Sequence, residues 1–278
     1  MIKKLYPYGK EKVFNVTYDD GVLQDVRFVE LLNKYKLKGT FNLNSGLIKN
    51  EFEWLHEKGF VVKRLSKEKV FDLYTGHEIA SHTLTHPFMQ DKTESEILYE
   101  LKEDKKNLEN IFNQKIKGFA VPFDYYSDLI EACAKKSGFE YARISEESLS
   151  FKPQTDYHRW KATIFHTDNT LEKFVNNFID SDEELAIFQI AGHTYDLDAE
   201  DMWDKIESIF NIISLQDNII SMTTIEIIDY LKAMGKAEIT DTYITNNSEH
   251  SLWFSINGTI CEVKSKNKFL FNISKCQD

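Results

Sequence analysis

The sequence predicts an α/β protein built as a distorted (β/α) barrel, and three observations lead to this prediction. Strand-like and helix-like segments alternate regularly along the chain, which is typical of a parallel sheet. About seven or eight such units follow one another, enough to curl a sheet into a complete or incomplete barrel. Polar residues directly follow several predicted strands, and barrels gather such residues at the carboxyl end of the sheet.

Strands are predicted where β-branched and aromatic residues cluster, and helices where apolar residues recur three or four positions apart. In the first half of the chain, strands are expected over residues 13–18, 40–43, 78–81 and 116–121. Helices are expected over residues 25–35, from a capping box at residues 93–96 onward, and over 127–136. This half therefore supplies repeated βα units.

The second half continues the pattern and then changes. Strands are expected over residues 139–143, 161–166, 185–191 and 218–222, and helices over 171–179, 201–215 and 225–234. After Gly235 only short strands are expected, over residues 242–244, 251–256 and 259–263, with a hairpin turn at Asn257-Gly258. We therefore predict a barrel domain over residues 1–235 and a small C-terminal β appendage, residues 236–278, packed on it.

Composition limits the classes of partner. The chain has 278 residues, and 45 acidic against 34 basic residues give a net charge of −11 at pH 7. Nucleic acids and anionic membranes are bound by clustered lysine and arginine, so neither is expected as a partner. The cysteines, Cys133, Cys261 and Cys276, are too few and too scattered for a disulfide framework, and free thiols are expected. The sequence leaves the oligomeric state open.

Targeting signals are not evident in the chain as given. The first residues carry lysines, but no apolar stretch follows them as it does in a signal peptide. No apolar run is long enough to cross a bilayer. A cytoplasmic location is expected, or an extracellular one if a signal segment was trimmed.

Two segments together supply the residues of a metal site. Residues 17–21 read Thr-Tyr-Asp-Asp-Gly, and residues 81–87 read Ser-His-Thr-Leu-Thr-His-Pro. The imidazoles of His82 and His86 lie four positions apart, and one carboxylate from the first segment completes three ligands. Three protein ligands leave positions open for water and substrate, and the second carboxylate stands where a general base is needed. This pattern predicts a metal-dependent hydrolase.

These motifs resemble those of a known family. Residues 17–21 are similar to its T-F-D-D-G motif, residues 76–87 to its G-H-E-I-(A/G)-x-H-(S/T)-x-x-H stretch, and residues 39–41 to the A-T-F strand between them. The chain resembles the polysaccharide deacetylases of carbohydrate esterase family 4, which have the NodB-type fold. The resemblance extends over residues 12–231 and implies a barrel of that type.

The resemblance implies a role for each motif residue. It implies that one divalent metal ion, usually zinc with other transition metals as alternatives, is bound by Asp20, His82 and His86. Asp19 would be the general base, and His193, in the sequence Ile-Ala-Gly-His, would be the general acid that protonates the leaving group. A backbone N–H just after Pro122, that of Phe123, would help to hold the oxyanion.

Two motifs of the family are altered in this chain. The third motif usually reads R-x-P-(Y/F), with the arginine tethering the catalytic aspartate, but Ala120 stands in the arginine position. Arg143 or Arg159 is expected to replace it from a neighbouring strand. The family's D-x-x-D-W motif is reduced to Trp160, and the acids or bases that could substitute in supporting the acid histidine are Asp124, Asp156 and His166.

The substrate is expected to be an acetylated saccharide. Sugar rings stack on aromatic faces, and the aromatic residues near the predicted strand ends are Phe123, Tyr125, Tyr126, Trp160 and Tyr195. Two alternatives remain. A cyclic amide or ureide hydrolase would use the same site on a different bond, and a carbohydrate-binding protein with weakened catalysis would account for Ala120.

Overall fold

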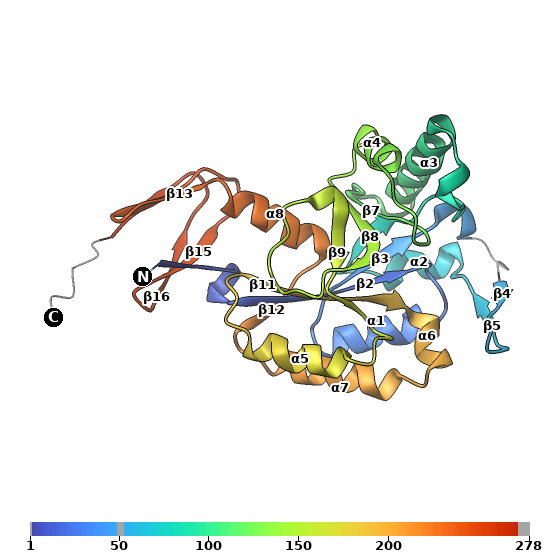
Figure 1. Ribbon diagram of the computed structural model, residues 1–278, viewed down its shortest axis with the longest axis horizontal. Coiled ribbons are helices and arrows are strands. Elements are labelled where there is room, and N and C mark those ends of the chain that lie inside the picture. Colours follow the sequence, from blue (N-terminus) through green and yellow to red (C-terminus); the bar gives the residue numbers. More distant parts are fainter. Residues whose placement is uncertain (1, 49–52, 272–278) are drawn as a thin grey trace.

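A parallel β-sheet that curls round on itself forms the centre of the fold (Figure 1). The computed structural model describes residues 2–48 and 53–271. The sheet has nine strands in the order β10-β11-β2-β3-β6-β7-β8-β9, with β12 paired to the first half of β2. Their bounds are β2 (Lys12–Asp19), β3 (Gly39–Leu43), β6 (Glu78–Ser81), β7 (Gly118–Ala120), β8 (Tyr141–Glu147), β9 (Trp160–Ala162), β10 (Ile164–Phe165), β11 (Ala186–His193) and β12 (Ile219–Ser221).

One extended segment joins the two edges of this sheet. Strands β9 and β10 are separated only by Thr163, and β9 pairs with β8 while β10 pairs with β11. The predicted strand over residues 161–166 is therefore divided between two partners, which is why it appears as two short strands. This pairing confirms the expected distorted α/β barrel.

Helices cover the outside of the sheet, as the alternating sequence pattern predicts. Their bounds are α1 (Asp25–Lys34), α2 (Lys67–Leu73), α3 (Glu94–Phe112), α4 (Asp128–Lys136), α5 (Leu171–Asp180), α6 (Thr194–Ala199), α7 (Trp203–Ser214) and α8 (Thr224–Met234). The predicted capping box at Thr93 is present, with Glu96 closing it, and Ser127 caps α4. Figure 1 shows α5 and α7 below the strands and α3 with α4 above them.

A core of aromatic side chains lies between the strands and the lower helices. Phe14 on β2 contacts Phe188 on β11 and Phe210 on α7, and all three are fully buried. Burial of one such ring contributes about 1.5–3 kcal/mol. This packing fixes β2 and β11 side by side over their whole lengths, from Lys12 to Asp19 and from Ala186 to His193.

The region after α8 forms small antiparallel sheets at one end of the molecule (Figure 1). Strands β15 (Leu252–Ile256) and β16 (Thr259–Val263) form the predicted hairpin, with Asn257 and Gly258 both at positive φ, as a two-residue hairpin turn requires. The N-terminal strand β1 (Ile2–Leu5) pairs with β15, and β14 (Tyr243–Asn246) lies between β13 (Ala237–Ile239) and β17 (Lys268–Leu270). The domain boundary at residue 235 remains a prediction, and the first strand shares a sheet with the appendage.

Two further observations bear on the sequence-based expectations. Cys133 and Cys261 are free thiols, and Cys276 lies outside the described residues. Among the helices of residues 2–48 and 53–271, none is long and apolar enough to cross a membrane.

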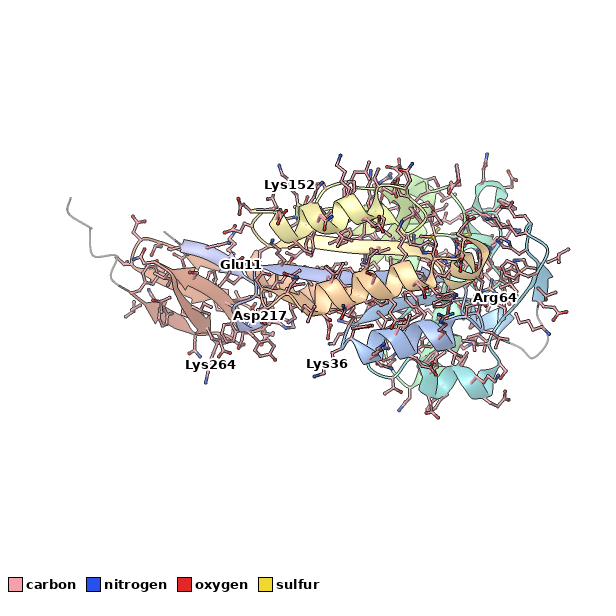
Figure 2. All side chains as sticks on the ribbon, turned by 90° about the horizontal axis from the view of Figure 1, so that it is seen from below. Glu11, Lys36, Arg64, Lys152, Asp217 and Lys264 are labelled. Atoms are coloured by element: carbon pink, nitrogen blue, oxygen red, sulfur yellow. The ribbon has the colours of Figure 1, made fainter. Side chains whose placement is uncertain are left out.

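A hairpin formed by β4 (Glu53–Leu55) and β5 (Val61–Lys63) was not expected from the sequence. It directly precedes Arg64, which lies at the opposite end of the molecule from Lys264 of the appendage (Figure 2).

Candidate active site

Polar residues from separate strand ends meet in a cleft of about 300 Å³ at the carboxyl end of the barrel. Asp19 and His193 are the last residues of β2 and β11 and are partners in the strand register. His82 follows β6 directly. The strand pairing therefore brings together residues that are far apart in the sequence, and the cleft is lined by Asp19, Asp20, His82, His86, Arg143 and His193, with Val121, Phe123, Asp124, Ser145, Phe165 and Tyr195 around them.

The predicted metal ligands form one cluster. One side-chain donor atom from each of Asp20, His82 and His86 lies within 4.8 Å of the others. Asp20 and His82 are buried, and His86 is partly buried. Asp20, Thr83 and His86 all adopt positive φ, a conformation that costs a residue with a side chain about 1 kcal/mol. Such strain is concentrated at functional sites, where the surrounding structure imposes it.

Hydrogen bonds leave the cluster ready for a cation. His82 Nδ1 lies 2.8 Å from the carbonyl oxygen of Ala120. Because a carbonyl only accepts, Nδ1 carries the proton and Nε2 keeps its lone pair. Asp20 Oδ1 is buried without a well-directed hydrogen bond, although it lies 2.8 Å from Arg64 Nη2. The cluster therefore offers one carboxylate oxygen and two imidazoles, the donor types that suit zinc and similar ions.

Asp19 is held by a cation and an amide. Arg143 Nη2 lies 2.5 Å from Asp19 Oδ2, and Asn42 Nδ2 donates to Oδ1 at 2.7 Å. Burial opposes the charge on Asp19, but the Arg143 guanidinium together with His82 and His193 outweighs it, so the pKa of the carboxyl is lowered. Arg143 is the register partner of Ala120. Of the two arginines expected to replace the missing one, the structure places Arg143 at Asp19, while Arg159 pairs with Glu131 and Asp128 at the surface.

Arg64 is a site residue that the sequence analysis missed. Its guanidinium pairs with the Asp20 carboxylate, donates to the backbone carbonyl of the same residue, and donates to Asn44 Oδ1 at 2.8 Å. Burial disfavours the Asp20 charge, yet Arg64 and the nearby histidines hold the pKa of Asp20 well below its usual range. Arg64 lies outside every motif, so nothing in the local sequence marks it.

His193 is supported from its own following helix. Its Nδ1 lies 3.0 Å from Asp196 Oδ2 on α6. Burial works against a charge on His193, but the bond to Asp196 and the charges of Asp20 and Asp19 outweigh it and raise its pKa to about 9. The expected supports were Asp124, Asp156 and His166. Asp124 lines the cleft, Asp156 caps the short helix at Tyr157–Arg159, and buried His166 reaches only within 3.8 Å of Asp196. The His-x-x-Asp spacing was the available signal for Asp196.

The aromatic residues expected at the substrate divide into two groups. Phe123 and Tyr195 line the cleft: Phe123 stacks on Phe88 at 3.8 Å between centroids, and the Tyr195 hydroxyl donates to Asp20 Oδ2 at 3.3 Å. Tyr125 and Tyr126 lie outside the cleft lining, and Tyr126 lies against Arg159.

Trp160, which was expected to contact substrate, lies in the core instead. It is fully buried, and its indole N–H donates to Gln189 Oε1 at 2.8 Å. Its position on β9 points it into the barrel core, where a sugar cannot reach it. Trp160 is therefore a core residue, and the prediction that it contacts substrate is wrong.

These features define the class of protein as an α/β barrel with an Asp-His-His cluster at the carboxyl end of its strands. The family model of the polysaccharide deacetylases matches residues 7–142 of this chain. A peptidoglycan-N-acetylglucosamine deacetylase of Bacillus cereus is 25% identical over 148 residues, which cover 50% of this chain and 62% of that relative. The chain thus spans less than two thirds of the length of this relative.

Solved structures agree with the barrel. The Xyl-CE4 domain of a multidomain xylanase from the hindgut metagenome of Trinervitermes trinervoides is 17% identical, with a TM-score of 0.51 over 81% of this chain and 93% of that one. A family 4 acetyl xylan esterase from Clostridium thermocellum, solved with a cobalt ion, is 15% identical, with a TM-score of 0.50 over 77% and 89%. At these identities the likeness establishes the fold alone.

Proposed function

We propose that this protein is a metal-dependent hydrolase that removes acetyl groups from an N- or O-acetylated saccharide. The observation that carries the proposal is the Asp20-His82-His86 cluster beside the buried carboxylate of Asp19. Three protein ligands leave coordination positions open, as catalytic sites require and structural zinc sites do not. The match of residues 7–142 to the polysaccharide deacetylase family model and the similarity to a peptidoglycan-N-acetylglucosamine deacetylase support the choice of reaction.

Asp20, His82 and His86 would hold one divalent metal ion. Zinc suits the donor set, and the cobalt ion of the related esterase supports a divalent transition metal. When bound, such an ion supplies Lewis-acid polarisation of the acetyl carbonyl and lowers the pKa of the attacking water. The His82 bond to the Ala120 carbonyl fixes the ring so that Nε2 faces the cluster.

Asp19 would act as the general base. Arg143 contacts Asp19 Oδ2, and Asn42 donates a hydrogen bond to Asp19 Oδ1. Each of these contacts uses one lone pair, and every carboxylate oxygen has a second one. Those pairs are free to accept the proton of the water that attacks the acetyl carbonyl. The lowered pKa keeps Asp19 ionised near neutral pH, so the base is in its active form before substrate binds.

His193 would act as the general acid. Asp196 engages Nδ1, which leaves Nε2 as the nitrogen that can donate a proton to the leaving amine or alcohol. The raised pKa of about 9 keeps the ring protonated at neutral pH. Water thus loses one proton to Asp19, and the leaving group gains one from His193, while the C–N or C–O bond breaks and acetate is released.

The substrate would enter beside aromatic surfaces. Phe123 is 40% exposed at the cleft, and the Tyr195 ring stacks on His193 at 4.9 Å between centroids. An aromatic face next to the acid positions a sugar ring with its acetyl group toward the cluster. The backbone N–H of Phe123 is the proposed oxyanion donor.

The two alternative functions differ from this proposal in measurable ways. A carbohydrate-binding protein with weakened catalysis would account for Ala120 in place of an arginine, but Arg143 supplies a cation to Asp19 from the neighbouring strand. A cyclic amide hydrolase would use the same cluster and would release no acetate.

The test measures metal content of the purified protein and then acetate release from acetylated oligosaccharides with and without a chelator. We expect about one metal ion per chain and acetate release that the chelator abolishes. Bound metal without acetate release from any acetylated saccharide would overturn the deacetylase proposal in favour of the alternatives. Absence of metal after reconstitution would overturn the metal site itself.

A further inference from the structure

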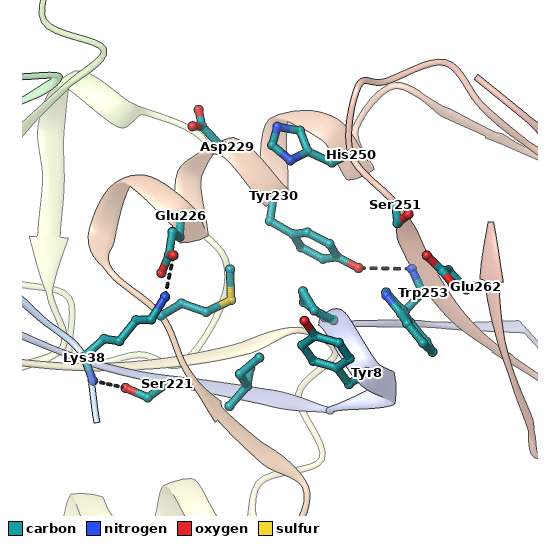
Figure 3. Close-up of a pocket in the computed structure, with 13 residues that line it drawn as sticks. Tyr8, Lys38, Ser221, Glu226, Asp229, Tyr230, His250, Ser251, Trp253 and Glu262 are labelled. Atoms are coloured by element: carbon teal, nitrogen blue, oxygen red, sulfur yellow. Dashed lines mark hydrogen bonds and ion pairs between the residues drawn. The ribbon is translucent and has the colours of Figure 1, made fainter. Parts of the chain in front are cut away.

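A second cleft, of about 670 Å³, lies where the barrel meets the appendage (Figure 3). Its walls come from the turn at Pro7–Gly9, from β12 and α8, and from β15 and β16. Lys38, which lines it, precedes β3, whereas the Asp-His-His cluster follows the strand ends. Strand β2 runs between the two sites, and its eight residues span roughly 23 Å. The second cleft is therefore separate from the candidate active site.

Aromatic side chains form one wall of this second cleft. Tyr8 is 73% exposed, and its ring lies 5.9 Å from that of half-buried Trp253, centroid to centroid. The Tyr230 hydroxyl accepts a hydrogen bond from the Trp253 backbone N–H at 3.1 Å and donates to the Leu5 carbonyl at 2.6 Å (Figure 3). This bridge ties α8 to both β15 and β1, so the backbone of Trp253 has a fixed position in the wall.

The backbone of Tyr8 makes its exposure unusual. Tyr8 adopts φ 64° and ψ 19°, the left-handed region that favours glycine and asparagine. A large aromatic residue is unfavourable at such a position for two reasons: its backbone is strained, and its ring is exposed to water. Strain that packing does not explain is a reason to look for a ligand.

The lining is acidic. Three carboxylates, Glu226, Asp229 and Glu262, line the cleft together with one lysine, Lys38. Glu226 pairs with Lys38 at 2.5 Å and Asp229 with Lys117 at 3.2 Å. Glu262 is exposed and has no ion pair within the described parts of the chain. An exposed carboxylate beside Tyr8 and Trp253 therefore provides a site for a cation, because ammonium groups are attracted both by carboxylates and by the faces of tyrosine and tryptophan rings.

We propose that this second cleft binds a saccharide chain carrying free amino groups, the product class that N-deacetylation generates. The proposal rests on the proposed function for the identity of the sugar. Sugar rings would lie against Tyr8 and Trp253, and a protonated amine would face Glu262. An N-acetylated unit is uncharged and cannot form the cationic contacts, so the cleft distinguishes product units from substrate units.

The distance between the second cleft and the candidate active site determines which saccharides can contact both. Because the two sites lie at opposite ends of the barrel, a short oligosaccharide cannot occupy both, whereas a polymer can be held by its deacetylated units while another part is processed. The cleft would then increase the effective concentration of polymer at the protein without changing the chemistry.

The test is calorimetric binding of a β-1,4-linked glucosamine hexamer and of its fully N-acetylated counterpart. Wild-type protein should bind the glucosamine hexamer, and Tyr8→Asn and Trp253→Ala should each weaken that binding at least tenfold. Asparagine is compatible with the left-handed backbone at position 8, so Tyr8→Asn is expected to fold. It therefore tests the cleft even where Trp253→Ala fails to fold. Tyr99→Asn, at a tyrosine on α3 that is 61% exposed, is the matched control and should leave binding unchanged.

Charge is tested on the same ligands. Glu262→Gln should weaken glucosamine-hexamer binding several-fold, and Tyr8→Asn should leave binding of the acetylated hexamer unchanged. Wild-type affinity for the glucosamine hexamer in both Tyr8→Asn and Trp253→Ala would overturn the proposal. Equal loss of the acetylated hexamer in those variants would overturn its selectivity for amines.

Acetate release from a short acetylated oligosaccharide separates this proposal from the proposed function. Tyr8→Asn should release acetate at the wild-type rate. Acetate release without Tyr8-dependent glucosamine binding would reject the second cleft alone. Tyr8-dependent glucosamine binding without any acetate release would reject the deacetylase proposal and leave the cleft as an amino-sugar site.

Discussion

The guanidinium of Arg143 on β8 forms an ion pair with the carboxylate of Asp19 at the end of β2. Both side chains are buried, at 3% and 9% exposure. Arg143 is paired in register with Ala120 on β7, the position where the family motif carries its arginine. The arginine therefore lies on β8, one strand away from the motif position on β7, and it pairs with the Asp19 carboxylate from there.

This pair predicts the effect of Arg143→Gln. Removing one partner leaves Asp19 as a buried unpaired charge, which costs about 3–5 kcal/mol of unfolding free energy. The pKa of Asp19 should rise because the largest favourable charge is lost, so the acid limb of the pH–rate profile should move to higher pH. Arg159→Gln is the control, since Arg159 pairs at the surface and should change stability by about 1 kcal/mol or less. An unmoved acid limb in Arg143→Gln would contradict the positioning role.

Asp19→Asn and His82→Ala should distinguish the proposed general-base role of Asp19 from the proposed metal-ligand role of His82. Asp19→Asn removes the proton acceptor and should lower turnover by about 10²–10⁴-fold while the metal content stays near wild type. His82→Ala removes a ligand and should lose both metal and turnover. Activity is measured as acetate release and metal by elemental analysis. Full activity in Asp19→Asn, or full metal content in His82→Ala, would refute the respective assignment.

Metal should stabilise the fold through the same cluster. A ligand that binds only the native state adds RT ln(1 + [L]/Kd), or about 2.7 kcal/mol at a concentration of 100 times Kd. Zinc added to chelator-treated wild-type protein should therefore raise Tm, whereas His86→Ala should show a much smaller rise. His250→Ala, at an exposed histidine of the appendage, is the matched control and should respond as wild type. An equal rise in His86→Ala would place the ion elsewhere.

Buried Glu78 should make stability depend on pH. Burial, the largest cause, raises its pKa from 4.5 to about 7, although Ile225, Thr40 and Tyr141 donate to it. The folded state therefore holds this proton more tightly than the unfolded chain, so the unfolding free energy falls as pH rises from 4.5 to about 7. The contribution lost is about 3 kcal/mol.

Glu78→Gln should remove that contribution and make the dependence shallower, while buried Asp25 and Asp104, whose pKa values burial also raises to about 7, keep the rest of it. The measurement is urea unfolding at pH 5 and pH 8 for both proteins. Variant and wild type that lose the same stability between these two pH values would show that Glu78 does not titrate in this window.

Trp160→Phe tests the reassignment of this tryptophan to the core. The change leaves buried Gln189 Oε1 without its indole donor and should cost about 1–3 kcal/mol of stability. KM should not change. Phe123→Ala, at the cleft, is the comparison and should raise KM several-fold with little loss of stability. A raised KM in Trp160→Phe at unchanged stability would return Trp160 to the substrate site.

Local sequence patterns predicted most strands and helices of the barrel and the residues of the Asp-His-His cluster, but not the hairpin of β4 and β5 or the helices α2 and α6. The capping box at Thr93 and the hairpin turn at Asn257-Gly258 occur as predicted because each depends on neighbouring residues alone. The cluster could be predicted because its ligands follow strands, and parallel strands of a barrel end on the same face. Strand β8 begins at Tyr141, two residues later than expected, since its pairing with β7 sets its start.

The sequence by itself determined the barrel, the carboxylate pair and the two histidines of the cluster, because periodicity and short spacings carry that information. Only the tertiary structure decided which cation meets Asp19, that Arg64 pairs with Asp20, that Asp196 supports His193, and that Trp160 is core. These contacts depend on strand register and on an inserted hairpin. The His193–Asp196 contact spans only three positions, and its spacing is a local signal. No local pattern encodes the other contacts, since each joins segments that meet only after the sheet has closed.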